Sequence, residues 1–194
     1  AAKDAWQELL HAVQRELIAA LHHAGKKVVL VNCSGSPIGL EPETGRCGAI
    51  LQAWYPGQAG GTAVAEVLFG DYNPAGRLPV TFYRNVSQLP DFEDYNMTGR
   101  TYRYMTQEPL FPFGHGLSYT SFCYGAVVLG SDNIKSGEKL RLNVPVTNTG
   151  KCDGEEVVQV YLKKNDDVEG PSKALRAFKR VHIPAGKTVD VEFD

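Results

Sequence analysis

The side chains best suited to chemistry in this chain are two groups of carboxylates. Glu41 and Glu43 follow the apolar stretch KKVVLVNC, and Asp91, Glu93 and Asp94 lie together in DFEDY. Neighbouring carboxyl groups can act as general acid and general base, and α/β sheets place their sites in loops at the carboxyl ends of strands. For both groups the sequence favours the simpler interpretation, a set of solvated surface carboxylates.

No other catalytic or ligand-binding pattern is complete. His115 lacks a Ser or Cys nucleophile pattern, so a packing role is favoured. The glycines of GQAGG lack the Lys and Ser/Thr of a phosphate-binding Walker motif and are interpreted as close packing of strand against helix. We see no cluster of metal ligands. We expect most of the cysteines to be unpaired core or loop residues, because they have neither zinc nor disulfide spacing: Cys33, Cys47, Cys123 and Cys152.

The composition predicts a globular protein that binds neither nucleic acid nor membranes. Among 194 residues, 20 are basic and 22 acidic, which gives a formal net charge of −2. Because these charges are mixed along the chain, there is no basic stripe for nucleic acid and no polybasic flank for a membrane. The longest apolar run is far shorter than the roughly 20 residues that span a bilayer, whereas a hydrophobic content of 43% can supply a core.

The beginning of the chain has the pattern of an α/β unit. Apolar residues recur at helical spacing from Trp6 to Leu21, and Gly25 follows where a left-handed C-cap is expected. KKVVLVNC and GAILQAW are apolar on both faces, as in buried parallel strands. GQAGGTAVAEVLFG predicts a helix that ends at Gly70, and RLPVTF, residues 77–82, predicts a third strand.

The rest of the chain changes character twice. Residues 83–118 are rich in aromatic residues, Pro and Gly and are too long for an ordinary connection; they include most of FPFGHGLSYT, where Gly114 and Gly116 can make tight bends. Alternating stretches separated by turns then predict an antiparallel β-sandwich, with fewer strands than the about seven that are usual. These stretches are FCYGAVVLG, KLRLNVPVTNTG, EEVVQVYLKK, ALRAFKRVHI and TVDVEFD.

Long, ordered parts of the sequence resemble the carboxy-terminal half of glycoside hydrolase family 3, the β-glucosidases and β-xylosidases. The resemblance covers nearly the whole chain, and NCSG and LPDFEDYNMTGRTYRYM are most similar to the bacterial, xylosidase-like members. The stretches that carry it are GKKVVLVNCSGSPIGL, AWYPGQAGGTAVAEVLFGDYNPAGRLPVTF, RTYRY, PLFPFGHGLSYTSF, VPVTNTG, GEEVVQVYL and LRAFKRVHIPAG.

The resemblance implies a fold class of α/β plus β. Residues 1–82 would form the C-terminal part of an α/β sandwich domain with a parallel sheet. Residues 83–118 would be an aromatic and Gly-rich linker that packs one domain against the next, and residues 119–194 a fibronectin type III-like β-sandwich without its last strands. In the family a TIM-like barrel precedes these domains, so we expect a chain that is truncated at both ends.

The resemblance also implies that the catalytic residues lie upstream. Family members take an Asp nucleophile from the barrel and an acid/base Glu from an earlier segment of the α/β domain, so we expect no catalytic residue here and no hydrolysis by the chain alone. It would instead contribute to the substrate rim, where aromatic and guanidinium groups suit sugar recognition, although interdomain hydrogen bonding explains RTYRY equally well. The rim candidates are Glu41, Glu43, Asp91, Glu93, Asp94, Arg100, Tyr102 and Arg103.

For the whole enzyme the resemblance implies an oligosaccharide substrate, contact with the barrel domain, no cofactor and no metal. It also implies a periplasmic or secreted location, although the chain carries no signal sequence. A homo-oligomer is compatible with the sequence, and the choice between glucosides and xylosides stays open. The alternative is a non-catalytic β-sandwich module that binds carbohydrate or a protein partner, for which the aromatic residues of the sandwich give weak support.

Overall fold

The computed structural model describes residues 10–91 and 93–194, and the chain divides into two compact units. The first unit comprises Ala1–Phe69, Leu78–His115 and Lys164–Ser172. The second comprises Gly70–Arg77, Gly116–Lys163 and Lys173–Asp194. The domain boundaries predicted from the sequence, between residues 82 and 83 and between residues 118 and 119, stay predictions.

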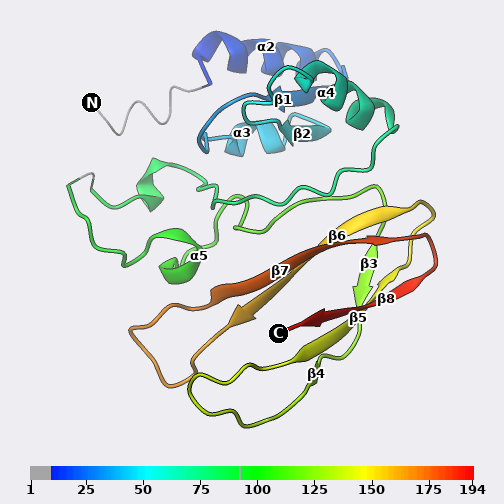
Figure 1. Ribbon diagram of the computed structural model, residues 1–194. Helices are drawn as coiled ribbons and strands as arrows, with labels where there is room; N and C mark the ends of the chain where they lie inside the picture. Colours follow the sequence, from blue (N-terminus) through cyan, green and yellow to red (C-terminus); the bar gives the residue numbers. More distant parts are fainter. Residues whose placement is uncertain (1–9, 92) are drawn as a thin grey trace. The chain divides into compact units, whose positions relative to one another are not determined.

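The first unit is built on a short parallel sheet with helices around it. Strands β1 and β2 pair in parallel, with Val29 opposite Ala49. Gly25 follows the helix before them with positive φ, as expected, and Gly70, which also has positive φ, follows the helix after them. Its elements are α2 (Ala12–His23), β1 (Val29–Asn32), α3 (Glu41–Thr44), β2 (Ala49–Gln52), α4 (Gly60–Phe69), the 3₁₀ turn η1 (Val86–Gln88) and α5 (Thr101–Tyr104) (Figure 1).

The predicted third strand was wrong. Residues 77–82 do not join β1 and β2; they run antiparallel to part of the aromatic segment. The N–H of Phe82 donates to the carbonyl of Phe111 at 2.9 Å, and the N–H of Leu78 donates to that of His115 at 2.8 Å. The sequence pattern correctly indicated extended backbone but could not show that its partner lies about thirty residues later.

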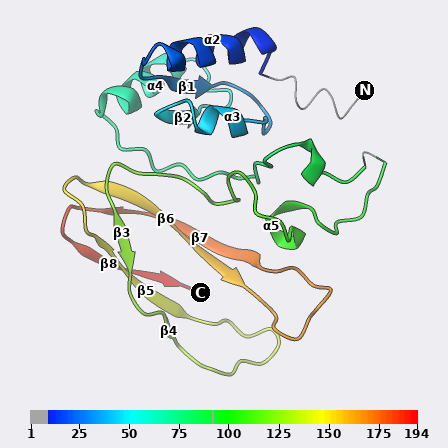
Figure 2. The same cartoon turned by 180° about the vertical axis from the view of Figure 1, so that it is seen from behind.

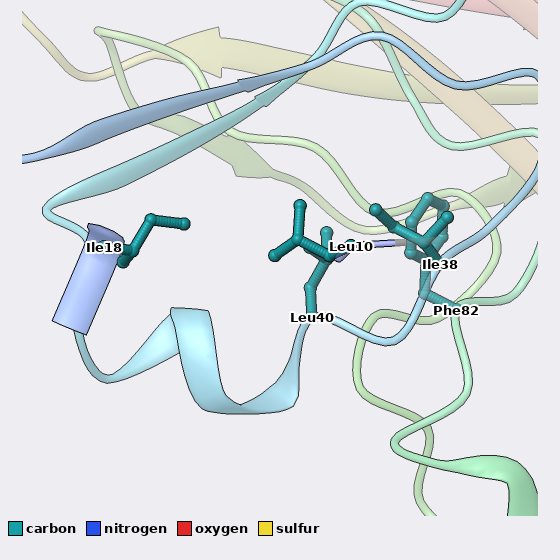
Figure 3. Close-up of a cluster of buried hydrophobic side chains, with 5 residues drawn as sticks. All are labelled: Leu10, Ile18, Ile38, Leu40 and Phe82. Carbon is teal, nitrogen blue, oxygen red and sulfur yellow. The ribbon is translucent and has the colours of Figure 1, made fainter. Parts of the chain in front are cut away.

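The aromatic segment helps to build the core of the first unit. The buried side chains Leu10, Ile18, Ile38, Leu40 and Phe82 form one cluster (Figure 3). Phe111 packs against this cluster. The Phe82 ring meets the rings of Trp54 and Phe111 edge to face, with centroids 6.2 Å apart in each pair. FPFGHGLSYT is therefore in part a packing segment. The expectation that β1 is fully buried was wrong, because Val29 is 48% exposed.

The second unit is an antiparallel β-sandwich, as predicted. β5 lies at the centre of one sheet, with β3 and β4 along one edge and β8 along the other, and β6 pairs with β7 in the second sheet (Figures 1 and 2). Val144 and Val146 from β5 pack with Val158 and Ile183 from the second sheet. The strands are β3 (Phe122–Tyr124), β4 (Val128–Leu129), β5 (Leu142–Asn148), β6 (Gly154–Leu162), β7 (Ala174–Ile183) and β8 (Thr188–Phe193).

A buried ionic cluster joins three segments of the second unit. The Glu156 carboxylate on β6 is nearly inaccessible and forms an ion pair with the Arg77 guanidinium. It also accepts a hydrogen bond of 2.8 Å from the Tyr124 hydroxyl on β3. Burial, and then this hydrogen bond to Glu156, raise the pKa of Tyr124 well above its ordinary value. The cluster holds β3, β6 and the segment around Arg77 together.

Replacing Tyr124 by Phe should reduce the loss of stability at alkaline pH. The pKa of Tyr124 is higher in the folded than in the unfolded state, so its contribution to the free energy of unfolding is complete below about pH 10 and falls as the pH rises further. Urea unfolding at about pH 8 and about pH 10.5 measures this loss. The unmodified chain should lose more stability than the variant; equal losses would mean that the hydroxyl is not perturbed by folding.

Candidate functional site

The candidate site is a groove of about 800 Å³ in the first unit, here called the α2 groove. Its walls come from the start of α2, from the loop after β1 together with α3, and from the segment that contains η1. The volume lies within the ~300–1,000 Å³ typical of ligand sites. Because α2 leads into β1 and packs beside it, its start lies toward the carboxyl edge of the parallel strands, where α/β folds place their sites.

Arg84 and Glu41 face each other in the α2 groove. Nη1 of Arg84 lies 3.4 Å from Oε1 of Glu41, and its Nη2 lies 3.5 Å from Oε2 of Glu108. Its Nε also donates to the carbonyl of Glu108 at 3.3 Å. Glu41 is thus half-exposed, lies at the first position of α3 and is engaged by an arginine. It is the one carboxylate predicted from the sequence that lines the groove.

Glu43 is fully buried, so its interpretation as a solvated carboxylate was wrong. Its side chain is 0% exposed, and Nε of Arg15 and Nη1 of Arg46 each lie 3.9 Å from its Oε1. Arg15, which lines the groove, also donates through Nη2 to the carbonyl of Gly39 at 2.6 Å. A general acid must reach the atom that it protonates; Glu43 cannot, and it serves instead as a counter-charge beneath Arg15.

Asp91 and Asp94 of the acidic stretch lie in a turn that Arg100 closes. Its Nε donates to the carbonyl of Asn96 at 2.9 Å, and its Nη2 donates to the carbonyls of Asp94 and Asp91. The Asp94 carboxylate accepts the N–H of Asn96 at 2.9 Å. Asp91 and Glu93 are exposed, whereas Asp94 is half-buried. Arg100 and Asp94 are therefore structural partners within the turn, and Glu93 is an exposed surface carboxylate.

The RTYRY stretch is connected to the groove through Tyr83. The Tyr102 ring stacks on Phe113 with centroids 4.2 Å apart and an interplanar angle of 18°, so it is engaged in packing. Arg103 is exposed and lies over the ring of the residue that follows it. The N–H of Thr101 donates to the hydroxyl of Tyr83 at 3.0 Å, and Tyr83 lines the groove. Because Tyr102 is engaged in packing and Arg103 is exposed, Arg103 is the better placed of these two for recognition of a sugar.

Sequence reasoning missed several polar residues of the α2 groove. Arg15 lies on an amphipathic helix whose sequence has no pattern typical of a binding site. Tyr83 and Arg84 directly follow the stretch that was wrongly predicted to be a strand. The available signal was the polar YRN sequence directly after an apolar extended stretch. It becomes meaningful only when the pairing of residues 78–82 brings this sequence beside α3.

The four cysteines are unpaired, and Cys47 packs against the core of the first unit. Cys33, Cys123 and Cys152 are exposed, and Cys47 is half-buried. Burial, and then the charge of Glu43, raise the pKa of the Cys47 thiol. Cys47 should therefore react with a thiol reagent such as DTNB at least about tenfold more slowly than the others near neutral pH, because the thiolate is the reactive form. Mass spectrometry of partially labelled protein measures this order, and early labelling of Cys47 would contradict it.

Within residues 10–91 and 93–194, no three side chains of His, Cys, Asp and Glu are placed to hold a metal ion. The helices of this part of the chain are too short or too polar to cross a bilayer.

Comparison with known proteins assigns the chain to a family. The model of the glycosyl hydrolase family 3 C-terminal domain matches residues 3–119, which is more than half of the chain. The chain belongs to glycosyl hydrolase family 3. A second model, of a fibronectin type III-like domain, matches residues 156–194 within the sandwich. The match confirms the resemblance and the fold class inferred from the sequence.

Family 3 relatives of this chain are much longer than it is. A xylan 1,4-β-xylosidase of Xylanibacter ruminicola is 58% identical over 179 residues, which cover 92% of this chain and 20% of that protein. A periplasmic β-glucosidase of Salmonella typhimurium is 42% identical over 93% of this chain and 25% of its own length. The chain thus spans about a quarter or less of these proteins.

Solved structures of β-glucosidases have the same fold. The β-glucosidase 3B of Thermotoga neapolitana in complex with glucose superposes with a TM-score of 0.84 at 33% identity, over 95% of this chain and 28% of that structure. A β-glucosidase of Erythrobacter marinus gives a TM-score of 0.81 at 44% identity, over 93% and 24%. The chain therefore shares its fold with about a quarter of each of these β-glucosidases.

Proposed function

We propose that this chain is the carboxy-terminal portion of a retaining, exo-acting β-glycosidase that releases terminal β-D-xylosyl or β-D-glucosyl residues from plant-type oligosaccharides. The observation that carries the proposal is the family 3 match over residues 3–119. The names of the relatives, xylan 1,4-β-xylosidase and β-glucosidase, support the two sugars. The relative with 58% identity is the xylosidase, which favours xylosides.

We also propose that the chain is inactive without the rest of the enzyme. A retaining glycosidase needs two carboxyl groups about 5 Å apart, both open to the sugar. The arrangement of the carboxylates supports inactivity: Glu43 is buried and Glu41 is engaged by Arg84. We infer that the nucleophile and the acid/base come from outside this chain, and that the chain contributes the α2 groove and the turn closed by Arg100.

The location and partners of the whole enzyme belong to the same proposal. One relative is named a periplasmic enzyme, and this name supports a location outside the cytoplasm. We infer a periplasmic or secreted enzyme in which this chain packs against a barrel domain. Its partner in the reaction is the oligosaccharide, and the proposed reaction needs no cofactor.

Hydrolysis of p-nitrophenyl β-D-xyloside and β-D-glucoside tests the proposal. It is measured side by side for the 194-residue chain and for the protein extended upstream through the barrel. Turnover is expected in the extended protein only, with the xyloside as the better substrate. Turnover by the short chain would show that a competent carboxyl pair lies within it, and no turnover by the extended protein on either glycoside would contradict the proposed function.

A further inference from the structure

We propose that the loop between β6 and β7, here called the strap, holds the strained turn α5 in place and so fixes the position of Arg103. β6 ends at Leu162 and β7 begins at Ala174, and both strands belong to the second unit. Residues Lys164–Ser172 of the strap belong instead to the first unit, as α5 does. The inference does not depend on the proposed function.

The strap is joined to α5 by a direct hydrogen bond. The N–H of Ser172 donates to the carbonyl of Arg103 at 2.6 Å. The last carbonyls of a helix have no partner within it, and α5 is a single turn, Thr101–Tyr104. Ser172 therefore supplies a donor that α5 itself cannot supply. The bond fixes the backbone from which the exposed Arg103 side chain extends.

The backbone of α5 is strained at Thr101. Its φ is +56°, in the left-handed region that glycine favours and that β-branched residues rarely adopt. Such a conformation is unfavourable and persists where the surrounding structure holds it. A single helical turn is also too short to be stable by itself. The conformation of α5 therefore depends on contacts with other segments of the chain.

The contacts of α5 act on both of its ends. At its start, the N–H of Thr101 donates to the Tyr83 hydroxyl at 3.0 Å, and the Tyr102 ring stacks on Phe113. At its end, the strap engages the carbonyl of Arg103. Because these contacts lie on either side of the strained backbone, loss of the strap should allow the end of the turn to open.

The strap has a defined shape of its own. Nζ of Lys164 lies 3.7 Å from Oδ2 of Asp167. A β-carbon at Gly170 would lie 2.5 Å from the carboxylate carbon of Asp167, so the side chain folds back closely over this glycine. Pro171 restricts the backbone directly before Ser172. A strap that is preshaped in this way loses less conformational freedom when it binds α5.

The test replaces the strap by a tight turn in the 194-residue chain. Leu162 lies opposite Ala174 in the β6–β7 ladder, so Lys163 and Lys173 can be joined by Asn-Gly in place of Lys164–Ser172. This change keeps the register of the two strands and removes the donor to α5. Ser172→Pro is the second variant, because it keeps the strap and removes its N–H.

The matched control shortens another loop of the sandwich in the same way. Leu129 of β4 lies opposite Leu142 of β5, so Asn-Gly can replace residues 131–140 without a change of register. These residues belong to the second unit and are remote in sequence from both α5 and the strap. The control therefore measures what loop shortening alone does to the sandwich.

Hydrogen exchange of the Tyr104 and Met105 amides is the measurement, since they donate to the carbonyls of Arg100 and Thr101 within α5. Their protection should fall at least about tenfold when the strap is replaced and at least about threefold in Ser172→Pro. It should change less than about twofold in the control. In a Thr101→Gly background, replacing the strap should cost no more than about threefold, because glycine adopts the left-handed conformation without strain.

Two results would overturn the inference. One is equal protection of the α5 amides in the strap replacement, in Ser172→Pro and in the control, which would show that the strap does not hold α5. The other is an equal loss of protection with and without Thr101→Gly, which would show that the strap does not oppose the strain. Both results are independent of turnover, so they leave the proposed function untouched, and failure of the proposed function would leave the strap intact.

Discussion

Replacing Phe82 by Ala is expected to lower the free energy of unfolding of the first unit by about 3–5 kcal/mol. The Phe82 side chain is only 1% exposed and lies in the core cluster, and its ring contacts those of Trp54 and Phe111. Removing it leaves a cavity that two neighbouring aromatic rings cannot fill without moving. Because residues 78–82 bind the aromatic segment, the substitution should also loosen the side of the α2 groove that Tyr83 and Arg84 form.

The fluorescence of Trp54 reports this loss directly, since its ring touches the mutated side chain. The chain has two tryptophans, so a Trp6→Phe background leaves Trp54 as the single reporter. Phe69→Ala in the same unit is the matched control: Phe69 is 84% exposed, and its loss should change stability by less than about 0.5 kcal/mol. Equal midpoints of urea unfolding for the two variants would contradict the assignment of Phe82 to the core.

Replacing Glu156 by Ala is expected to destabilise the second unit by about 3–5 kcal/mol. The substitution leaves the Arg77 guanidinium, whose side chain is 11% exposed, without its counter-charge and leaves the Tyr124 hydroxyl without its acceptor. Removing one partner of a buried ion pair is far more costly than removing an exposed one, because the remaining charge stays desolvated. The effect should be largest at β3 and β6, which the cluster joins.

Hydrogen exchange of the β3 and β6 amides measures this change. Protection of these amides should fall by roughly a hundredfold or more, as expected for a loss of about 3 kcal/mol. The neighbouring Glu155 is the control, since its ion pair with Arg180 is half-exposed and such pairs contribute about 0–1 kcal/mol. If Glu155→Ala and Glu156→Ala reduced protection equally, the buried cluster would not be the stabilising feature inferred here.

The sequence predicted the β-sandwich closely because its signals are local. ALRAFKRVHI alternates with period two between turn residues, and β7 has the same bounds, Ala174–Ile183. FCYGAVVLG was also predicted to belong to the sandwich and does so, but it forms two short strands with Gly125 between them. Because only one face of each sheet is buried, the alternation of apolar and polar residues is enough to predict such strands.

The candidate site was predicted less well because it depends on contacts between distant segments. Glu41 was chosen for its place after a strand and does line the groove, while the same argument chose Glu43, which points into the interior. These carboxylates are two residues apart on a helical turn, where side chains face different directions. Arg84 could not be chosen, because its importance follows from its distance to Glu41 and Glu108 in the folded chain.

The most direct test of the central claim is to trap the covalent glycosyl-enzyme of the extended protein. A slow 2-deoxy-2-fluoro-β-xyloside labels the nucleophile of a retaining glycosidase, and peptide mass spectrometry then locates the label. A labelled carboxylate is expected outside this 194-residue chain, with none on Glu41, Asp91, Glu93 or Asp94. A label on any of these four side chains would place the nucleophile within this chain and contradict the proposal that it only supports the reaction.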